Sequence, residues 1–496
     1  MSKENLKIRD DLKGITFTII FEADALNRDE KIGGNIPSIK KLTRFGNKTY
    51  SYLSRVAMRH YLFETLSKNY PNEWKPANCI ESGTGEKKVV QFDLQTQNIL
   101  THAELDAFGY MFTISGQTSI TRKAPVGITK AVALETWEGD MQFNANHDLA
   151  NRCRANPNPV NKEEHKSFFK VSFTIDVEKL GYDEWWIKDY NYDDTSKKLT
   201  LFLSERGTDV ILKNVKKGEE EFQYFIDNKE IRIDGLTCYV DKELMEEKTK
   251  KDKKTKDEKK YITFKSNLLE KKKEEHITEE SSGNKDNSKG SKNKGKSKTF
   301  EIYEGDYSFD DEQNLYQFTI GKYFYDEQKN TLMLSMVLLA HTIDAEKEQG
   351  EKYKIIKDNL KIGQIEIKNE GQNKKAIFQL EDREKQKRLY QILEVLRNGL
   401  IYHSSGENYG IVPQFIIAAG LKLPIPIFHS FVELNSFDRS ILENAYILKH
   451  EKSDANQNKK LIFAYKSEKF RNLDVSDACG DWYEFLMSLG LGCGEK

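Results

Sequence analysis

Residues 118–143 read TSITRKAPVGITKAVALETWEGDMQF, and the prediction of the fold starts from this stretch. Apolar residues recur at near-alternate positions from Val126 onward, and Pro125 and Gly127 interrupt the run, so the pattern predicts a strand, a basic turn and a strand. The turn carries Arg122 and Lys123. Hydroxyls and cations beside a β surface suit phosphate oxygens, because they donate hydrogen bonds whichever base is attached. The alternative is an exposed, solvated hairpin.

The charge of the chain is balanced overall but uneven along its length. The 496 residues include 78 Lys and Arg against 79 Asp and Glu. Residues 246–299 hold 18 Lys, no Arg and 11 Asp or Glu, a local charge of +7 that leaves −8 on the rest. Any anion-binding surface outside this segment must therefore be a local patch. The composition of residues 246–299 predicts disorder, with a possible short ordered piece at 261–269, and with solvation or loose binding of nucleic acid as alternative roles.

The first residues, the lack of a long apolar run and the spacing of the cysteines indicate a cytoplasmic protein. The first 14 residues contain no apolar core typical of a signal peptide, and no run approaches the roughly 18 apolar residues of a membrane span. The 5 cysteines are widely spaced, and no pair has zinc-ligand spacing, which favours reduced thiols. We expect no metal, cofactor or membrane partner.

The first predicted strand is ITFTIIFE, residues 15–22, which places Ile15, Phe17, Ile19 and Phe21 on one face. A long loop follows up to residue 49. It contains cations and turn residues, and charged loops of this length often carry binding sites. The members that we single out are Lys40, Lys41, Arg44 and Asn47.

A helix is predicted at residues 51–66, SYLSRVAMRHYLFETL, with Ser51 or Ser54 as its cap. Its predicted buried face carries Leu53, Val56, Ala57 and Phe63. Arg55 and Arg59 are four residues apart, so both can face one ligand. The alternative is that they are surface ion-pair partners.

Two later segments complete the predicted order. Residues 138–166 are rich in Asn, contain Pro157 and Pro159 and show no sustained period, which predicts a protruding insertion. After an alternating strand at 169–175, the clearest helix covers 381–400 and a further strand covers 423–434. The apolar stripe of that helix consists of Leu389, Ile392, Leu393, Leu396 and Leu400. The order β-α-β-β-α-β with large insertions predicts an α+β protein with a ferredoxin-like, RNA-recognition-motif core.

Several motifs in the same order resemble the DevR-like family of CRISPR-associated proteins, the backbone subunit of type I-B Cascade. They are NRDEKIGGNIPSIKKL (27–42), YSYLSRVAMRHYLFETL (50–66), LDAFGYMF (105–112) and RKAPVGITKAVAL (122–134). The resemblance is best from residue 15 to about 181. It implies a modified RNA-recognition fold that polymerises along CRISPR RNA, grips its phosphates and inserts a thumb-like hairpin between bases. The guide would then pair with target DNA in segments.

The resemblance also suggests roles for individual residues. Asn27, Lys40, Lys41, Ser54 and Arg59 fall at matching positions, and Arg122 falls on the motif that leads into the thumb. Residues 138–166 would be the thumb, with Met141 or Phe143 as its wedge. The chain departs from the family at Phe63, where a second basic residue is common, and in EEHKSFF (163–169) and SSG (404–406).

These inferences give a domain and site hypothesis. The core comprises 1–137, 167–245 and 300–440, the thumb 138–166, a disordered insertion 246–299 and a peripheral C-terminal segment 441–496. The expected partners are CRISPR RNA, target DNA through the guide, further copies of the chain and other Cascade subunits. The predicted RNA-binding residues are Asn27, Lys40, Lys41, Arg44, Asn47, Ser54, Arg55, Arg59, Thr121, Arg122, Lys123 and Lys130.

Two alternatives come from other functional classes. Asp24 and Asp29 lie in and around the loop after the first strand, where two carboxylates can hold Mg²⁺ beside a phosphate in an RNA nuclease. The other alternative is a protein-interaction scaffold that binds no nucleic acid. The chain has no Walker glycine loop, H-E-x-x-H or G-x-S-x-G motif, so we expect a non-catalytic protein.

Overall fold

The computed structural model divides the chain into two compact units, which are described separately. Unit 1 comprises residues 1–185, 346–368 and 376–496, and unit 2 comprises 186–345 and 369–375. The described residues are 7–28, 37–44, 46–82, 89–113, 119–203, 210–220, 222–234, 237–251, 258–270, 301–303, 307–336, 339–371, 373–404, 407–444, 446–450 and 460–492. None of the helices within these ranges is long and apolar enough to cross a membrane.

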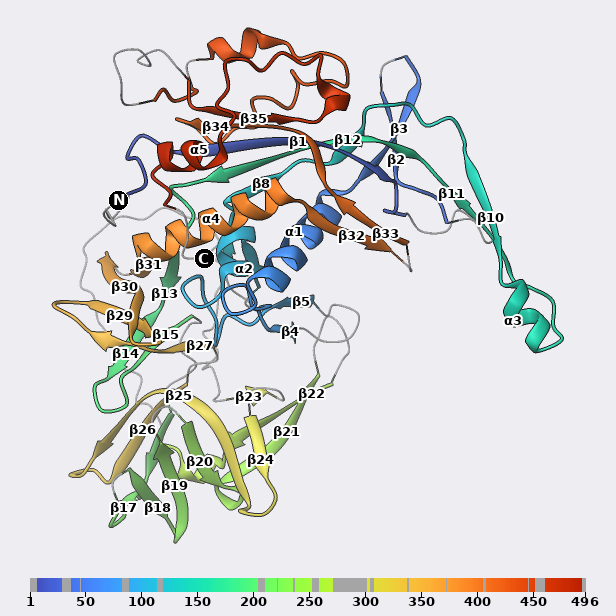
Figure 1. Ribbon diagram of the computed structural model, residues 1–496. Helices are drawn as coiled ribbons and strands as arrows, with labels where there is room; N and C mark the ends of the chain where they lie inside the picture. The colour runs from blue at the N-terminus through green and yellow to red at the C-terminus, as the bar shows by residue number, and fades with distance from the viewer. Residues whose placement is uncertain are drawn as a thin grey trace, which may run out of the picture. The chain divides into compact units, whose positions relative to one another are not determined.

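Unit 1 is built on an antiparallel sheet with the strand order β2-β3-β9-β12-β1-β34-β35, to which β8 is added by pairing with β12 (Figure 1). The sheet combines segments from both ends of the chain. Its strands are β1 (Gly14–Asp24), β2 (Lys41–Arg44), β3 (Lys48–Leu53), β8 (Val126–Ile128), β9 (Ala131–Ala133), β12 (Lys166–Asp176), β34 (Pro413–Leu421) and β35 (Ile462–Lys466).

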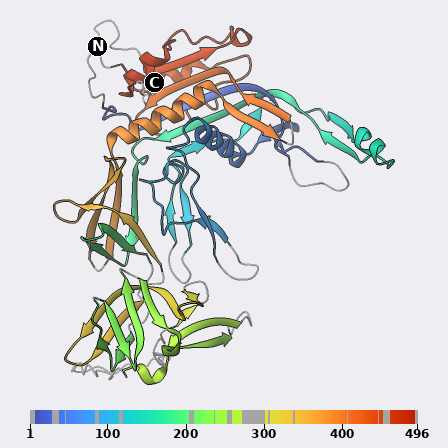
Figure 2. The same ribbon diagram turned by 60° about the horizontal axis from the view of Figure 1, so that its bottom comes forward.

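Two helices cover one face of this sheet. They are α1 (Arg55–Asn69) and α4 (Asp382–Asn398), which lie side by side (Figures 1 and 2). The predicted face of β1 is confirmed, since Ile15, Phe17, Ile19 and Phe21 are buried in the core with both helices. The apolar stripe predicted for 381–400 is confirmed by the burial of Leu389, Ile392, Leu393, Leu396 and Leu400. In α1 one predicted core residue is misplaced, because Val56 is 71% exposed.

The opposite face of the middle strands is covered by the C-terminal segment (Figure 1). Ile20, Phe415 and Ile417 pack there with residues such as Phe428, Val432 and Phe470. The predicted strand at 423–434 is wrong, because the interior strand is β34. Pro424 and Pro426, which cannot donate to a β ladder, follow it.

The prediction of a peripheral segment at 441–496 is also wrong for its last part. Strand β35 pairs with β34 in the central sheet. In α5 (Trp482–Ser488), the Trp482 ring lies edge-on to Phe17 at 6.1 Å between centroids. Phe485 and Leu486 belong to the same core as β1. The segment thus closes the core of unit 1.

The opening motif does not form the single hairpin that its pattern predicted. Strand β7 (Ile120–Arg122) pairs with β6 (Tyr110–Phe112), whereas β8 and β9 both pair with β12. The cause is tertiary, since each short strand finds a different partner. The remaining small elements of this part are α2 (Ala103–Phe108), β4 (Cys79–Ser82), β5 (Val89–Phe92), β6 (Tyr110–Phe112), β7 (Ile120–Arg122), β32 (Leu400–Ser404), β33 (Glu407–Ile411) and the 3₁₀ turns Arg439–Glu443 and Glu468–Phe470.

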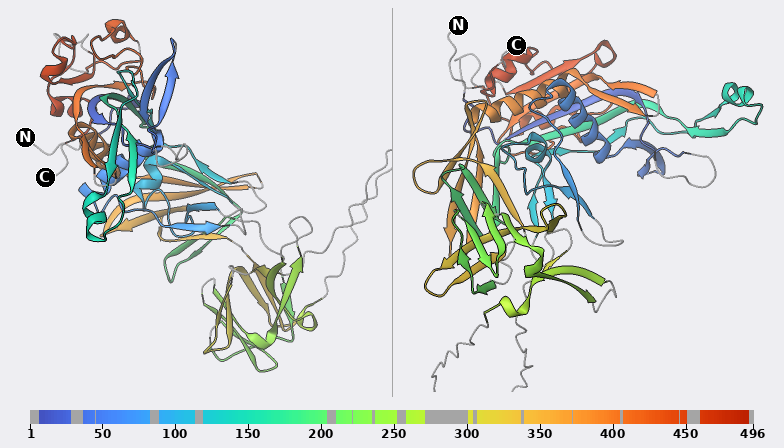
Figure 3. Two further views of the ribbon diagram at one scale, coloured as in Figure 1. Left: turned by 90° about the vertical axis from the view of Figure 1, so that its right-hand side faces the viewer. Right: turned by 90° about the horizontal axis from the view of Figure 1, so that it is seen from below.

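A long hairpin projects from the end of the central sheet (Figures 1 and 3). Strands β10 (Met141–Ala145) and β11 (Pro159–Glu163) pair in antiparallel fashion, and the short helix α3 (His147–Arg152) lies at the tip. The residues predicted as a protruding insertion, 138–166, form this hairpin and its two roots.

A further sheet has the order β13-β31-β30-β29-β28. Its strands are β13 (Tyr182–Ile187), β28 (Glu346–Lys347), β29 (Lys352–Lys357), β30 (Leu360–Glu370) and β31 (Asn373–Leu380). The ring of Trp185 packs against Phe378 at 4.4 Å between centroids, which joins β13 to β31.

Unit 2 consists of antiparallel strands around its own core (Figure 3). The sequence analysis placed these residues in one core with unit 1 and missed the unit, because short alternating strands do not show which sheet they join. The strands are β14 (Asp189–Asp193), β15 (Lys198–Phe202), β16 (Val210–Lys213), β17 (Lys216–Lys217), β18 (Gln223–Ile226), β19 (Lys229–Asp234), β20 (Thr237–Asp241), β21 (Met245–Lys251), β22 (Glu258–Phe264), β23 (Ile302–Tyr303), β24 (Tyr307–Asp310), β25 (Leu315–Asp326), β26 (Thr331–Met336) and β27 (Ala340–Asp344), with 3₁₀ turns at Lys242–Leu244 and Ser266–Leu268.

The prediction of disorder across 246–299 is corrected where the structure describes these residues. Strands β21 and β22 pair along their length, and Ile262 and Phe264 are buried in the core of unit 2. Two apolar side chains at alternate positions thus anchor a hairpin whose other residues are mostly charged. Residues 252–257 and 271–300 of the predicted segment lie outside the described ranges.

Candidate nucleic-acid interface

The end of the central sheet formed by β2, β3 and β9 carries two pairs of a cation and an aromatic ring. The Arg44 guanidinium lies 5.7 Å from the centroid of the Tyr50 ring, and the Lys130 ammonium lies 4.5 Å from that of Tyr52. Both cations are exposed and both tyrosines are half-buried. Tyr50 and Tyr52 are two residues apart on β3, so they point to the same face. We call these four residues the tyrosine patch.

The register shows which face of the sheet the patch occupies. Tyr52 lies opposite Val132 on β9, and Val132 lies opposite Lys170 on β12. The Lys170 ammonium donates to the carbonyl of Val432 at 2.6 Å in the C-terminal segment. The patch is therefore on the face away from α1 and α4. The C-terminal segment covers the middle strands of this face, while the cations of the patch stay exposed.

Among the described residues, neither Arg44 nor Lys130 has an ion-pair partner. Their charge therefore remains available to an anion, unlike that of a lysine already paired with a carboxylate. Half-buried tyrosine rings beside free cations suit single-stranded nucleic acid, because bases stack on the rings and phosphates meet the cations. The Arg44 charge also acts on the covering segment, where burial first, then Lys170 and Arg44, lower the pKa of His429 to about 4.

A further cation, Lys41, lies at the root of the projecting hairpin and is already paired. Its ammonium donates to both carboxylate oxygens of Glu163 at 2.6 and 2.7 Å, and it lies 3.8 Å from the centroid of the Trp137 ring. The same carboxylate accepts from the Ser38 hydroxyl at 2.6 Å and from the Ile39 amide at 3.0 Å. The Glu163 carboxylate on hairpin strand β11 thus contacts both strand β2, through Lys41, and the loop before β2, through Ser38 and Ile39.

The start of α1 is organised by Ser54 and Asn27. The Ser54 hydroxyl accepts from the Ala57 amide at 3.2 Å, which confirms Ser54 as the cap. The Asn27 side chain accepts from the Ser54 amide at 2.8 Å. Arg55, the first residue of the helix, is exposed and has no ion-pair partner within the described ranges.

Arg55 and Arg59 do not share one environment. Arg59 donates to the Glu104 carboxylate at 3.0 Å, and its guanidinium lies 4.8 Å from the centroid of the Phe108 ring. The ion-pair alternative therefore describes Arg59, whereas Arg55 faces solvent. This arrangement does not support the prediction that Arg55 and Arg59 face one ligand.

Arg122 lies in a buried ionic network rather than on a surface turn. Only 8% of the residue is exposed. Its guanidinium donates to Asp106 at 2.7 Å and to the Lys179 carbonyl at 2.8 Å, and it also contacts Asp183 and the Tyr182 carbonyl. Asp106, fully buried, also accepts from Arg388 at 2.7 Å. Because these contacts occupy the hydrogen-bond donors of the guanidinium, we assign Arg122 to the core and not to phosphate binding.

The remaining residues that were predicted to bind RNA or to act as the thumb wedge differ in exposure and in the element that carries them. Thr121 and Lys123 are exposed beside Arg122, and Lys40 is half-buried next to Lys41. Asn47 forms the turn between β2 and β3 with φ of 57°, a left-handed conformation that Asn tolerates. On β10, Met141 is 49% and Phe143 64% exposed.

The carboxylates of the nuclease alternative are not brought together in the described part of the chain. Asp24 ends β1, where its backbone carbonyl accepts from the Tyr402 hydroxyl at 2.7 Å, and Asp29 lies outside the described ranges. Across the described residues, no group of three or more His, Cys, Asp or Glu side chains is arranged to hold a metal ion.

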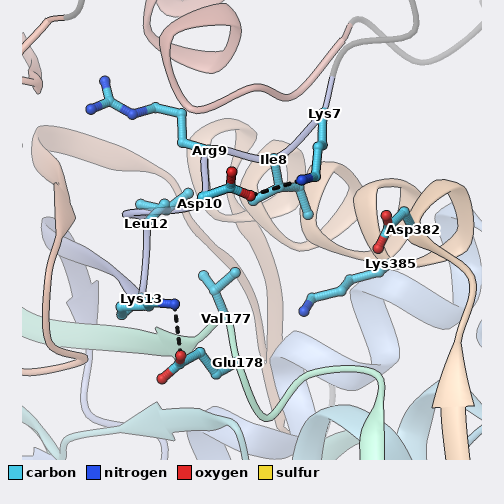
Figure 4. Close-up of a pocket in the computed structure, with 10 residues that line it drawn as sticks. All are labelled: Lys7, Ile8, Arg9, Asp10, Leu12, Lys13, Val177, Glu178, Asp382 and Lys385. Carbon is cyan, nitrogen blue, oxygen red and sulfur yellow. Dashed lines mark hydrogen bonds and ion pairs between the residues drawn. The ribbon is translucent and has the colours of Figure 1, made fainter.

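A polar pocket elsewhere in unit 1 offers less to an anion. It lies where the N-terminal segment meets the start of α4 (Figure 4). Two of its cations are paired, Lys7 with Asp10 at 2.9 Å and Lys13 with Glu178 at 2.8 Å. We therefore place the candidate interface at the tyrosine patch, whose two cations have no ion-pair partner among the described residues.

Sequence reasoning missed Tyr50, Tyr52, Trp137, Ser38 and Glu163. The alternation in TYSYL, residues 49–53, was a usable signal for a strand with two tyrosines on one face. It was read instead as the end of a loop and the start of the helix. The contacts of Glu163 had no local signal, because its partners are more than 120 residues away.

Comparison with known proteins shows the family. The CRISPR-associated negative auto-regulator DevR/Csa2 family matches residues 15–439, and the chain belongs to this family. No curated protein matches. The solved structures that resemble the chain include "CRISPR RNA-guided surveillance complex, pre-nicking", with 10% identity, a TM-score of 0.24 and coverage of 34% of this chain and 65% of that chain.

A second solved structure, "CRISPR RNA-guided surveillance complex", has 10% identity and a TM-score of 0.21 over 34% of this chain and 51% of that chain. In both cases the matched region is less than two thirds of the other chain. Such low TM-scores say nothing specific about the fold of this protein, so the family assignment rests on the 15–439 match.

Proposed function

We propose that this protein is a non-catalytic, RNA-binding backbone subunit of a type I-B Cascade-like complex. The observation that carries the proposal is the tyrosine patch, in which Arg44 and Lys130 are exposed beside Tyr50 and Tyr52. Cations would meet RNA phosphates, and the rings would stack on bases without selecting a sequence. Membership of a CRISPR-associated family makes CRISPR RNA the natural ligand.

The order of the sheet supports a modified RNA-recognition motif. Strand β1 is followed by α1, then β9 and β12, then α4 and β34, and these strands lie in the order β34-β1-β12-β9. This is the β-α-β-β-α-β pattern with the first and third strands at the centre. Because the C-terminal segment covers the centre of the face away from the helices, RNA would run past β2, β3 and β9 at the end of the sheet.

The projecting hairpin is the proposed thumb. Met141 and Phe143 are two residues apart on β10, so both exposed side chains lie on the same face of the hairpin. A large apolar side chain on such a face would separate stacked bases at the cost of a few kcal/mol per step, as intercalating side chains do in duplexes. The guide would then be presented to target DNA in segments.

The proposed assembly consists of further copies of this chain along one RNA, together with other Cascade subunits, in the cytoplasm. Head-to-tail contacts between identical chains generate open arrays, so the length of the RNA would limit the number of copies.

The direct test is titration of the purified chain with a fluorescein-labelled single-stranded RNA at several salt concentrations. We expect anisotropy to rise at low salt for unrelated sequences, and log K to fall linearly with log salt. Binding confined to one sequence, or a salt-independent affinity, would contradict a contact made mainly through phosphates.

A further inference from the structure

The carboxylate of Glu163 lies in a set of donors that would suit a phosphate equally well. Four hydrogen bonds at 2.6–3.0 Å reach it from the Lys41 ammonium, the Ser38 hydroxyl and the Ile39 amide. An ammonium, a hydroxyl and a backbone amide are the groups that commonly bind phosphate oxygens. We call Ser38, Ile39 and Lys41 the anion cradle.

Glu163 occupies the cradle as an anion. Burial by itself would raise the pKa of Glu163, but the hydrogen bonds from Lys41, Ser38 and the Ile39 amide outweigh burial and lower it. The side chains of Lys41 and Glu163 remain 21% and 12% exposed, so both are in contact with solvent. An external anion would enter the cradle as the carboxylate leaves it.

The surroundings of the cradle are fixed by contacts that do not involve this carboxylate. Arg28 donates to the backbone carbonyl of Glu163 at 2.7 Å and to that of Pro37 at 3.3 Å. Trp137 donates from its ring nitrogen to the Glu164 carbonyl at 3.2 Å. The side chain of Glu163 can thus leave while the root of the hairpin stays in place.

We propose that the anion cradle is a backbone-phosphate site, in which Glu163 acts as an internal placeholder that a phosphate of bound RNA displaces. The inference rests on the proposed function and adds a site to it, because Ser38, the Ile39 amide and Glu163 were not among the expected contacts. Displacement exchanges one anion for another on Lys41, so the cradle is neutralised both before and after RNA binding.

The placeholder has a measurable consequence for affinity. In the native chain a phosphate that binds Lys41 releases its own counterion, but the displaced Glu163 carboxylate attracts a cation in return, so the net ion release at the cradle is small. In Glu163→Gln the side chain keeps its size and an oxygen acceptor, but Lys41 becomes an uncompensated cation. We expect this variant to bind single-stranded RNA at least about fivefold more tightly at low salt, with a salt slope steeper by about 0.7.

The matched control is Glu164→Gln, which removes the same charge from the neighbouring residue outside the cradle. It should change affinity much less than Glu163→Gln, with no change in slope. Lys41→Ala should weaken binding more in the Glu163→Gln background than in the native chain, because only there is Lys41 free. The proposal would be overturned if a folded Glu163→Gln variant had the same RNA affinity and the same salt slope as Glu164→Gln.

A second measurement needs no variant. Carbodiimide labelling of carboxyl groups in the native full chain, read by mass spectrometry, compares Glu163 with Glu164 with and without the same RNA. We expect the labelling of Glu163 to rise severalfold on RNA binding while that of Glu164 changes little. Unchanged protection of Glu163 in an RNA-saturated chain would overturn the proposal. Failure of the native chain to bind RNA would instead contradict the proposed function.

Discussion

The side-chain oxygen of Asn27 accepts a hydrogen bond from the Ser54 amide at 2.8 Å, which ties the start of the loop after β1 to the cap of α1. Ser54 in turn accepts from the Ala57 amide at 3.2 Å. Two of the residues that the family resemblance selected thus satisfy backbone amides at the start of a helix. Both side chains therefore have a structural role at the start of α1.

Ser54→Ala should lower the free energy of unfolding by about 1 kcal/mol, because the helix loses its side-chain cap. Asn27→Ala should cost a similar amount, about 1 kcal/mol, through the lost hydrogen bond. Urea unfolding followed by circular dichroism measures both. Ser54→Thr, which keeps the hydroxyl, is the control, and an equal loss in that variant would argue against capping as the cause.

Arg122→Ala and Lys123→Ala should separate a structural arginine from a surface lysine. Removing Arg122 leaves Asp106 and Asp183 with less compensation in the core, so we expect a loss of about 3–5 kcal/mol in the free energy of unfolding. Lys123→Ala should leave stability within about 0.5 kcal/mol. Thermal unfolding compares the two. If Arg122→Ala were as stable as the native chain while RNA binding was lost, Arg122 would be a ligand after all.

Arg44→Ala and Lys130→Ala should each weaken binding of single-stranded RNA and make the salt slope shallower by about 0.7, since each removes one phosphate contact. The effect should be the same for unrelated RNA sequences. Lys216→Ala, at an exposed lysine of unit 2, is the control. Native affinity in the Arg44→Ala, Lys130→Ala double variant would remove the tyrosine patch from the interface.

Replacing a tyrosine of the patch tests stacking separately from charge. Tyr50→Ala should weaken RNA binding by about 1–3 kcal/mol without changing the salt slope, whereas Tyr50→Phe should bind nearly as well as the native chain. Anisotropy titration at two salt concentrations distinguishes the outcomes. An equal loss in both variants would mean that the hydroxyl, not the ring, makes the contact.

Stability should fall as the pH is lowered from 6.5 to about 4, in part because of His429. Burial, Lys170 and Arg44 lower its pKa to about 4, so the folded chain keeps His429 neutral while the unfolded chain protonates it near its ordinary value of 6.5. The unfolded state then binds more protons, which lowers stability by up to about 1.4 kcal/mol per pH unit. His429→Gln should reduce this slope, as measured by urea unfolding at several pH values. An unchanged slope would exclude His429 as a contributor.

The sequence predicted best where a local pattern coincides with burial. The alternation of Ile15, Phe17, Ile19 and Phe21, the stripe on α4 and the aperiodic insertion at 138–166 all have direct counterparts in the structure. Motifs in order also led to the family, which the match over 15–439 shows. Each of these signals is carried by neighbouring residues, so it could be read without the fold.

The errors arose where distant residues decide the environment. Arg122 is buried because Asp106, Lys179 and Tyr182 converge on it, and no spacing in the sequence shows this. Strand β35 enters the central sheet through β34, and unit 2 separates from unit 1 through strand pairings that alternation does not specify. For the same reason the sequence could not show that Lys41, predicted as an RNA-binding residue, is paired with Glu163.

The most direct test of the central claim is to purify the tagged protein, without nuclease treatment, from cells that express a CRISPR array, and to sequence the nucleic acid that accompanies it. The account predicts processed CRISPR RNA, protected at regular intervals against added nuclease. Recovery of the protein free of RNA at low salt, from cells in which the other subunits are present, would contradict it.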